Sequence, residues 1–572
     1  GAEDGGVSVS SLDDLDALLG DLPARHPLYI HAGASALPLL ALLDALAARR
    51  KFPLGKVAGC VGADPLGALL ERGSLPAGLD ALFGEMAQTF AWARDRETPL
   101  RTVLIRGSVF HNGGASAVQE VACAMTSAIE TLRALRERGV DVAEFSRRLR
   151  FEFSLSSNFF MEIAKLRAAR CVWAQIASSF GGDAEAQKAQ IFGRTSLFTK
   201  TVYDPYVNML RNTTEAFSGV VGGVDGLTVG CFDEALRPGS EFSRRVARNA
   251  QVLLQKEFNL LQPEDPAGGS WYVEKLTDEL ARKAWEELQR IEAAGGFLKS
   301  VREGVIQRDI QSVLQQRFKR LAQRADRAVG TNMYPNPAEP LPEFAEPDRR
   351  AQRAERAEAL RRFRAGRDGG AVERALEGAA ASGTVSSAAD AASAGATLGE
   401  LRAALGRKGD GALSVEPILL HRWTEQYEAM RRRTEAFEAE KGDNFKVFLA
   451  NMGPIPQHKA RADFIASFME VAAFEILRND GFAEVGECAA AAAASGADIA
   501  VICSTDASYP ELVPPLARAI KERCPGMGVY LAGAPAADCK DSYVEAGVDG
   551  FISIRSNCLE TLTEFQRAKG MF

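Results

Sequence analysis

The stretch KVFLANMGPIPQHKARADF (residues 446–464) decides the fold of the C-terminal part of this chain. KVFLAN predicts a strand, and the residues after it predict a loop. A helix is then expected to about residue 479, and the short runs AEVGE, DIAVICS, GVYLAG and GFISI alternate with further helices. The pattern predicts a five-unit doubly wound domain over 445–572, whose ligands bind beyond the carboxyl ends of its strands. The loops to inspect for a site are 451–460, 504–509 and 532–537.

Working outward toward the N-terminus, residues 1–345 alternate short apolar runs with longer amphipathic stretches, as repeated β-α units do. The candidate strands are HPLYIHAG, KVAGCVGAD, RTVLIRGS, LRFEFSLS, AQIFGRTS and GLTVGCFD. Apolar residues at helical spacing predict helices at 34–50 and 158–176, and a helix within 271–296 is expected to start at Thr277 as its N-cap. Six or seven such units favour an α/β fold of the (β/α)8 TIM-barrel type. A complete barrel needs eight strands, so at least one is unaccounted for, and the first strand is the candidate for the missing one.

Residues 346–444 are charged and then rich in Ala, Ser and Gly, which predicts a helical connector between the two domains.

Composition excludes several classes of function. A net charge of −7, with acids and bases interspersed, argues against a nucleic-acid surface or a basic membrane anchor. We find no run of about 18 apolar residues and no basic-then-apolar leader. The nine scattered cysteines form no C-x-x-C pair, which argues against disulfides and a zinc site and fits a reducing cytoplasm.

A β/α barrel, a connector and a flavodoxin-like domain in this order resemble the methylmalonyl-coenzyme A mutase family. The most specific similarities to the family barrel lie in four stretches: residues 158–176, 232–235, 242–255 and 265–285. The resemblance covers nearly the whole chain. It starts after the family's first barrel strand and long N-terminal segment, so this part is expected to be absent or to precede residue 1. The resemblance also implies that the C-terminal domain is similar to a cobalamin-binding domain.

In the family, the last domain carries D-x-H-x-x-G on its first loop, where the imidazole binds the cobalt of cobalamin. The aligned positions here, including that of a nearby lysine, are all changed: Asn451, Ile455, Gln457 and Ala460. A carboxamide at Gln457 is a poor substitute for an imidazole held by a carboxylate, so this chain is expected to bind neither cobalamin nor a metal. His458 could be a displaced ligand. A solvent-facing or capping role is favoured, because Pro456 stands where the supporting acid would be.

The other cobalamin loops implied by the resemblance are weakened too. The family's S-x-L becomes Ser504, Thr505 and Asp506, which puts a carboxylate where the nucleotide tail is expected. The Gly-Gly after the fourth strand becomes Ala532 and Gly533, so the backbone can approach a ligand less closely. Three changed loops on one crevice indicate a lost cofactor site.

The barrel positions that the resemblance assigns to catalysis are changed as well. The aromatic and imidazole positions of a G-Y-H stretch are Ser108 and Val109, a further histidine position is Ser196, and the H-T-N stretch begins at Thr228. Without these groups, a thioester and a migrating radical would not be positioned. His111 remains near the predicted barrel mouth, where a structural role is favoured over a catalytic one.

The resemblance therefore implies the non-catalytic small (beta) subunit of a heterodimeric, adenosylcobalamin-dependent methylmalonyl-CoA mutase in the cytoplasm. Adenosylcobalamin is expected in the catalytic large subunit, which would be the partner, and not in this chain. Two alternatives stay open: an active acyl-CoA mutase with atypical cobalamin binding, and a stand-alone scaffold.

Overall fold

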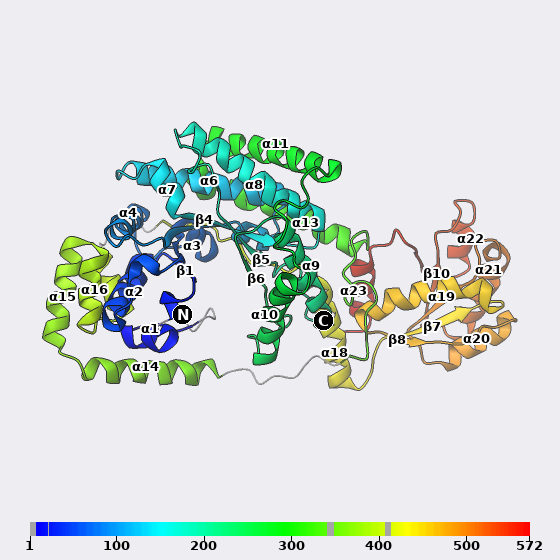
Figure 1. Ribbon diagram of the computed structural model, residues 1–572. Helices are drawn as coiled ribbons and strands as arrows, with labels where there is room; N and C mark the ends of the chain where they lie inside the picture. Colours follow the sequence, from blue (N-terminus) through cyan, green and yellow to red (C-terminus); the bar gives the residue numbers. More distant parts are fainter. Residues whose placement is uncertain (1–6, 21, 340–347, 407–412) are drawn as a thin grey trace. The chain divides into compact units, whose positions relative to one another are not determined.

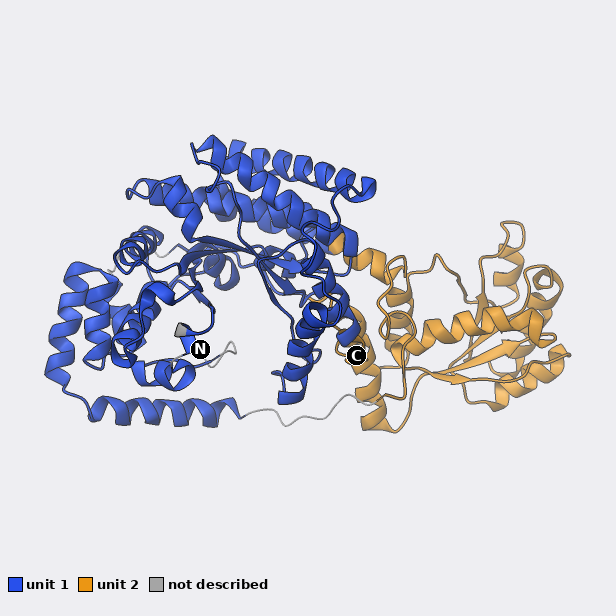
Figure 2. Ribbon diagram, viewed as in Figure 1, with its two compact units in different colours: residues 1–198, 209–314, 343–421 blue, residues 199–208, 315–342, 422–572 orange. Residues whose placement is uncertain are grey.

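The computed structural model describes residues 7–20, 22–339, 348–406 and 413–572. The chain folds into two compact units, coloured separately in Figure 2. Unit 1 comprises residues 1–198, 209–314 and 343–421, and unit 2 comprises residues 199–208, 315–342 and 422–572. The segment 346–444, predicted as a connector, thus contributes to both units, and its predicted start after residue 345 lies outside the described residues.

Unit 1 contains one parallel sheet whose six strands pair in chain order, and all six predicted strands are present. The strands are β1 (Leu28–Gly33), β2 (Gly59–Ala63), β3 (Arg101–Arg106), β4 (Leu149–Leu155), β5 (Ile191–Thr195) and β6 (Gly226–Thr228). The strands β2 to β5 read as nearly continuous apolar runs because both of their faces are largely buried, whereas β1 and β6 are more exposed. Parallel strands in chain order, each followed by helix, are the repeating unit of a β/α barrel.

The sheet of unit 1 is strongly curled. The rings of Tyr29 on β1 and Phe192 on β5 lie 4.8 Å apart, centroid to centroid. In a flat sheet these strands would be about 19 Å apart, taking about 4.8 Å per strand spacing. The guanidinium of Arg150 on β4 lies 4.7 Å above the same Tyr29 ring. Side chains of β1, β4 and β5 therefore meet on the concave face of the curled sheet. Within the described residues, β1 and β6 are the edge strands, so closure to eight strands remains a prediction.

Three helices pack side by side over the sheet of unit 1: α6 (Ala117–Arg136), α8 (Phe159–Ser179) and α11 (Trp271–Ala293) (Figure 1). The prediction of Thr277 as the N-cap of α11 is wrong. The hydroxyl of Ser270 accepts the hydrogen bond of the Val273 amide and starts the helix two turns earlier. Thr277 is buried within the helix and its hydroxyl accepts a hydrogen bond from Arg167.

The remaining helices of unit 1 surround this framework. A second core forms where α2 (Ala36–Arg50) packs against the alanine-rich helices α15 (Gly369–Ser382), α16 (Val385–Ser393) and α17 (Leu398–Leu405). By contrast, α14 (Arg349–Ala365) has no buried residue. The other helices are α1 (Leu12–Leu19), α3 (Pro65–Arg72), α4 (Leu79–Asp95), α5 (Ser108–Asn112), α7 (Val142–Arg148), α9 (Val207–Val221), α10 (Glu241–Lys256), α12 (Phe297–Arg302) and α13 (Val305–Ala322), of which α9 and α13 extend into the ranges of unit 2.

Unit 2 is built on a parallel sheet in the order β11-β10-β9-β7-β8, which is the flavodoxin-like order 2-1-3-4-5. Its strands are β7 (Lys446–Asn451), β8 (Glu475–Leu477), β9 (Ile499–Cys503), β10 (Gly528–Ala532) and β11 (Gly550–Ile552). Its other helices are α18 (Glu425–Lys441), α19 (Ile455–Met469), α20 (Val485–Ala494), α21 (Tyr509–Arg523), α22 (Lys540–Glu545) and α23 (Cys558–Ala568). The strand order reverses between β7 and β9, so the crevice for a ligand lies at their carboxyl ends.

Two details of unit 2 differ from the sequence prediction. The second strand is β8, at residues 475–477, and not AEVGE, because α20 already begins at Val485 within that stretch. The helix predicted to reach residue 479 ends at Met469, and the short turn Glu470–Ala472 follows it. In both units, no helix of the described residues is long and apolar enough to span a membrane. All nine cysteines are unpaired.

Candidate functional site

The carboxyl ends of the strands in unit 1 hold the barrel positions that the sequence analysis singled out. Ser108 and Val109 lie on the short helix α5 that follows β3, and both are buried. The Ser108 hydroxyl donates to a Glu152 carboxylate oxygen at 2.6 Å, while Val109 packs in the main core. Thr228 ends β6 and is half-buried. Ser108 and Val109 thus serve packing and internal hydrogen bonding.

Ser196 and His111 are brought together by the fold. His111 Nε2 lies 2.7 Å from the Ser196 hydroxyl, and His111 Nδ1 lies 3.6 Å from a carboxylate oxygen of Glu120. Serine, histidine and acid in this sequence of contacts resemble a nucleophile, its base and the group that orients the base. Ser196 is only 1% exposed and Glu120 is fully buried, so no acyl carbon can approach the hydroxyl without displacing side chains. These side chains therefore form a buried internal network, and the structural role of His111 stays a prediction.

Behind this pair lies a buried cation that sequence reasoning missed. The ammonium of Lys165 contacts Glu120 at 2.7 Å and Glu162 at 2.5 Å, and donates to the Ser154 carbonyl at 2.6 Å. Burial alone raises the pKa of Glu120, but the Lys165 charge outweighs it, and the pKa falls to about 2. The carboxylates in turn raise the pKa of Lys165 against the opposing effect of burial. The only sequence signal was Glu162 three residues before Lys165 in an apolar helix.

In unit 2, the predicted loop 451–460 is short, because α19 already begins at Ile455. Pro454 is the N-cap and a second proline lies in the first turn, where a missing backbone N–H is tolerated and a fixed φ favours the helix. Gln457 and Ala460 are therefore helical residues, and both are exposed. In the sequence, these two prolines were the signal that a helix begins here. The residues of the first turn of α19 therefore do not lie on an extended loop.

A solvent-facing or capping role is expected for His458; the side chain is buried, so the solvent-facing alternative is wrong. Its Nδ1 lies 3.0 Å from the Gly453 carbonyl oxygen, to which a protonated Nδ1 donates. At the same edge of the ring, Gly481 has a φ of +99°, and a Cβ there would lie 2.5 Å from His458 Cε1 and 2.9 Å from the Gly453 carbonyl oxygen. The Nδ1–Cε1 edge of the ring thus packs against both glycines. Nearby, Asn451 is buried, and its amide nitrogen donates to the Asn479 carbonyl at 3.2 Å.

Contacts within unit 2 also connect the loops after β9 and β10. The Ser504 hydroxyl donates to the Met452 carbonyl at 3.1 Å, and the Tyr509 hydroxyl donates to the Ala532 carbonyl at 2.8 Å. Asp506, the carboxylate expected to oppose a buried nucleotide tail, is paired with Arg461 of α19 at 2.7 Å. These bonds join the three predicted cofactor loops directly to one another. Among the described residues, no group of three or more His, Cys, Asp or Glu side chains could hold a metal ion.

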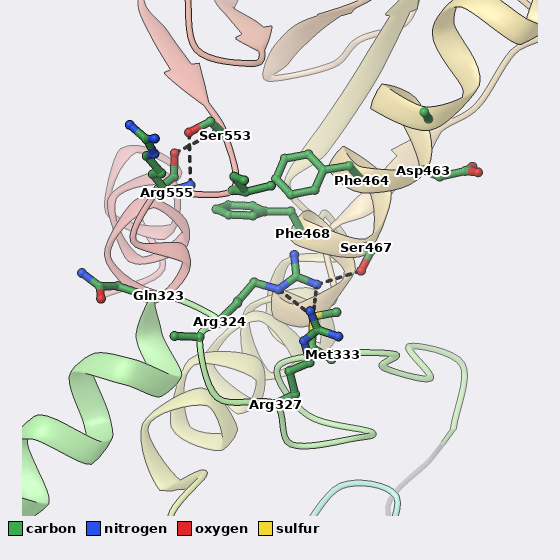
Figure 3. Close-up of a pocket in the computed structure, with 14 residues that line it drawn as sticks. Gln323, Arg324, Arg327, Met333, Asp463, Phe464, Ser467, Phe468, Ser553 and Arg555 are labelled. Carbon is green, nitrogen blue, oxygen red and sulfur yellow. Dashed lines mark hydrogen bonds between the residues drawn. The ribbon is translucent and has the colours of Figure 1, made fainter.

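A pocket of about 820 Å³ lies along α19, with Ala460 in its lining (Figure 3). Phe464 and Phe468 form an aromatic wall, their ring centroids 6.0 Å apart. The Arg324 guanidinium lies 5.8 Å from the Phe468 ring and donates to the Ser467 hydroxyl at 2.9 Å. Aromatic faces beside a cation suit a flat, negatively charged group. Sequence reasoning did not find this pocket, because Arg324 comes from a segment far away in the sequence.

Comparisons with known proteins relate this chain to a single family. The sequence model described as methylmalonyl-CoA mutase matches residues 2–410. The methylmalonyl-CoA mutase small subunit of Streptomyces virginiae is 32% identical over 557 residues, which cover 96% of this chain and 78% of that protein. The large subunit from the same organism is 30% identical over 530 residues, 89% of this chain and 72% of that protein. The methylmalonyl-CoA mutase of Escherichia coli is 29% identical over 534 residues, 90% and 75% of the two chains. The chain therefore belongs to the methylmalonyl-CoA mutase family, a family named for an isomerase.

Proposed function

We propose that this chain is the non-catalytic small subunit of a heterodimeric, adenosylcobalamin-dependent methylmalonyl-CoA mutase. It would support a catalytic large chain in the cytoplasm, in the rearrangement between succinyl-CoA and (R)-methylmalonyl-CoA. Adenosylcobalamin would be bound by the large chain only. The curled sheet of unit 1 would belong to an eight-stranded barrel that has kept its fold and lost its site.

One observation carries the proposal: Gln457 lies in the first turn of a helix, with a carboxamide where the family motif has an imidazole. An amide oxygen is a weak ligand for cobalt, and Ile455 offers no carboxylate to support it. The neighbouring imidazole of His458 is buried and directed at the Gly453 carbonyl. A displaced ligand would require α19 to unwind at its start.

The mouth of unit 1 supports the same proposal. A site that binds a polar ligand has to keep donors and acceptors available for it. Here the Ser108 hydroxyl is bonded to Glu152, and His111 is bonded to Ser196. Binding a thioester at these positions would break internal bonds that the side chains already make, and each buried group left unpaired would cost about 1–3 kcal/mol.

Two measurements test the proposal. The purified chain is incubated with adenosylcobalamin, separated from free cofactor by gel filtration, and examined for corrin absorbance and for turnover of (R)-methylmalonyl-CoA. Neither is expected. The chain is also co-expressed with the mutase chain of its source organism that has an intact D-x-H-x-x-G stretch, and a one-to-one complex with cobalamin on that chain is expected. Stoichiometric corrin on the isolated chain, together with turnover, would refute the assignment.

A second candidate is an active acyl-CoA mutase with atypical cobalamin binding. The pocket beside Ala460 favours it, because its aromatic wall and arginines could hold part of a large anionic cofactor without a bond to cobalt. The 30% identity to a large subunit is also close to the 32% identity to a small subunit. The turnover assay separates the two candidates. A stand-alone scaffold would show neither turnover nor a mutase partner.

A further inference from the structure

Unit 1 exposes a group of aromatic side chains that its own core does not use. Four of them are markedly exposed: Trp271 at 91%, Tyr272 at 62%, Phe160 at 48% and Phe217 at 36%. Together with the half-buried Phe159 they form what we call the aromatic patch. It is built from the first turns of α8 and α11 and from α9, all labelled in Figure 1.

Four rings of the aromatic patch form one continuous row, and Trp271 adjoins Tyr272 in the chain. Phe217 lies 5.2 Å from Phe159, Phe159 lies 5.2 Å from Phe160, and Phe160 lies 5.5 Å from Tyr272, all between ring centroids. Edge-to-face contacts of this kind fix ring orientations. A water-exposed surface built from ordered aromatic rings is the type of surface that protein interfaces bury at their centre.

The backbone beneath the patch is held rigidly. Ser270 caps α11 directly before Trp271, and the Gly269 amide donates to Glu274 in the first turn. At the start of α8, the side chain of Asn158 caps the helix through the Met161 amide. Because the backbone that carries the anchors is already ordered, little backbone entropy would be lost when a partner covers them.

The charges beside the patch are largely neutralised within unit 1. Arg167 is paired with Glu274 at 2.8 Å and with Asp265 at 3.0 Å. A partner is therefore not selected by a strong field of one sign, and an apolar protein surface with few charges fits best. This arrangement of an aromatic centre and a paired polar rim is typical of lasting protein interfaces.

The size of the patch fits a protein partner. A fully exposed aromatic side chain offers about 150–250 Å², so the four exposed members present roughly 350–600 Å². This is at or near the largest patch of a typical monomer and roughly 45–75% of the roughly 800 Å² that each partner contributes to a standard interface. Polar residues around it could supply the remainder.

We propose that the aromatic patch is the docking surface for the catalytic mutase chain, with Trp271 and Tyr272 as its main anchors. The inference rests on the proposed function, which requires such a partner. Small and large subunits from one organism are 32% and 30% identical to this chain, so its partner would be a related chain of comparable size and not a short peptide. A second copy of this chain is the competing occupant.

The test uses the full chain and the catalytic chain of the same organism, recognised by its intact D-x-H-x-x-G stretch. The dissociation constant is measured by isothermal titration with the wild type, with the double variant Trp271→Ala/Tyr272→Ala, and with the control Phe258→Ala. Phe258 is 61% exposed but lies beyond the end of α10, outside the patch. The double variant is expected to bind at least about 30-fold more weakly, while Phe258→Ala binds like the wild type. Trp271→Phe should recover most of the loss.

The possible outcomes have distinct meanings. If wild type and double variant bind the catalytic chain equally, the docking surface is refuted and the proposed function survives. If the wild type does not bind that chain at all, both fail. Sedimentation of the chain alone checks the competing occupant: a homodimer that the double variant disrupts would overturn the assignment to the catalytic chain. Circular dichroism confirms that the variants are folded, which is expected because the replaced side chains are exposed.

Discussion

Replacing Lys165 by Met should destabilise unit 1 more than almost any other change of a single charge. The Lys165 ammonium is fully buried between Glu120 and Glu162, at 2.7 Å and 2.5 Å. Methionine keeps the length and apolar character of the stem but leaves two buried carboxylates without their cation. Removing one partner of a buried ion pair costs about 3–5 kcal/mol, which is a large part of the roughly 5–15 kcal/mol that stabilises a typical domain.

Urea unfolding followed by tryptophan fluorescence measures this effect. With a slope of about 2–3 kcal/mol per M, the loss lowers the urea midpoint of unit 1 by roughly 1–2.5 M. The matched control is Lys188→Met, because Lys188 forms an exposed pair with Glu185 and such pairs contribute at most about 1 kcal/mol. A midpoint for Lys165→Met within about 0.3 M of the wild type would mean that the buried pair does not stabilise the fold. The same experiment on Lys165→Arg would then show whether charge or shape matters.

Three further predictions address the network and unit 2. Because the pKa of Glu120 is held at about 2, below its ordinary value of 4.5, its stabilising effect is present above pH 4.5 and lost as the pH falls toward 2; acid titration of unfolding should show this loss, and Glu120→Gln should reduce it. Gly481→Ala should destabilise unit 2 by about 2–4 kcal/mol in thermal unfolding, because φ is +99° and the methyl group would strike the His458 ring, whereas Gly486→Ala, in a helix with open space around it, should stabilise by up to about 1 kcal/mol. Restoring the motif with Ile455→Asp and Gln457→His should not yield a chain that retains corrin after desalting, because both positions are helical; retained, stoichiometric corrin absorbance would contradict this.

Most strands could be predicted because a buried strand has a simple apolar pattern in the sequence. LRFEFSLS became β4 and DIAVICS became β9, since buried parallel strands read as apolar runs. The missed strand β8 has three residues and follows a turn at Ala473, which takes a φ of +57° where a glycine would have signalled the break. Without that signal the helical pattern of α19 continued too far in the prediction.

The site was predictable only in part. The changed positions were found through resemblance to a family, but their surroundings were not, because these depend on contacts between distant residues. Glu120 and Lys165 are 45 positions apart and meet only because α6 and α8 pack together. The start of α19 was readable from its prolines, yet the expected loop of the family motif suggested otherwise. At the start of α19, the two prolines predicted the structure better than the family motif did.

In the proposed small subunit, the loss of a site and the stability of the fold would be connected through hydrogen bonding. A binding site tolerates unpaired polar groups until its ligand arrives, which costs free energy in the empty state. At the mouth of unit 1, Ser108 bonds to Glu152 and His111 bonds to Ser196, so these polar residues satisfy one another. If these positions have lost catalytic groups, as we propose, the same substitutions would also stabilise the empty chain. A subunit that only has to hold a partner would gain stability when its polar groups bond to one another. An enzyme would lose its substrate site by the same change.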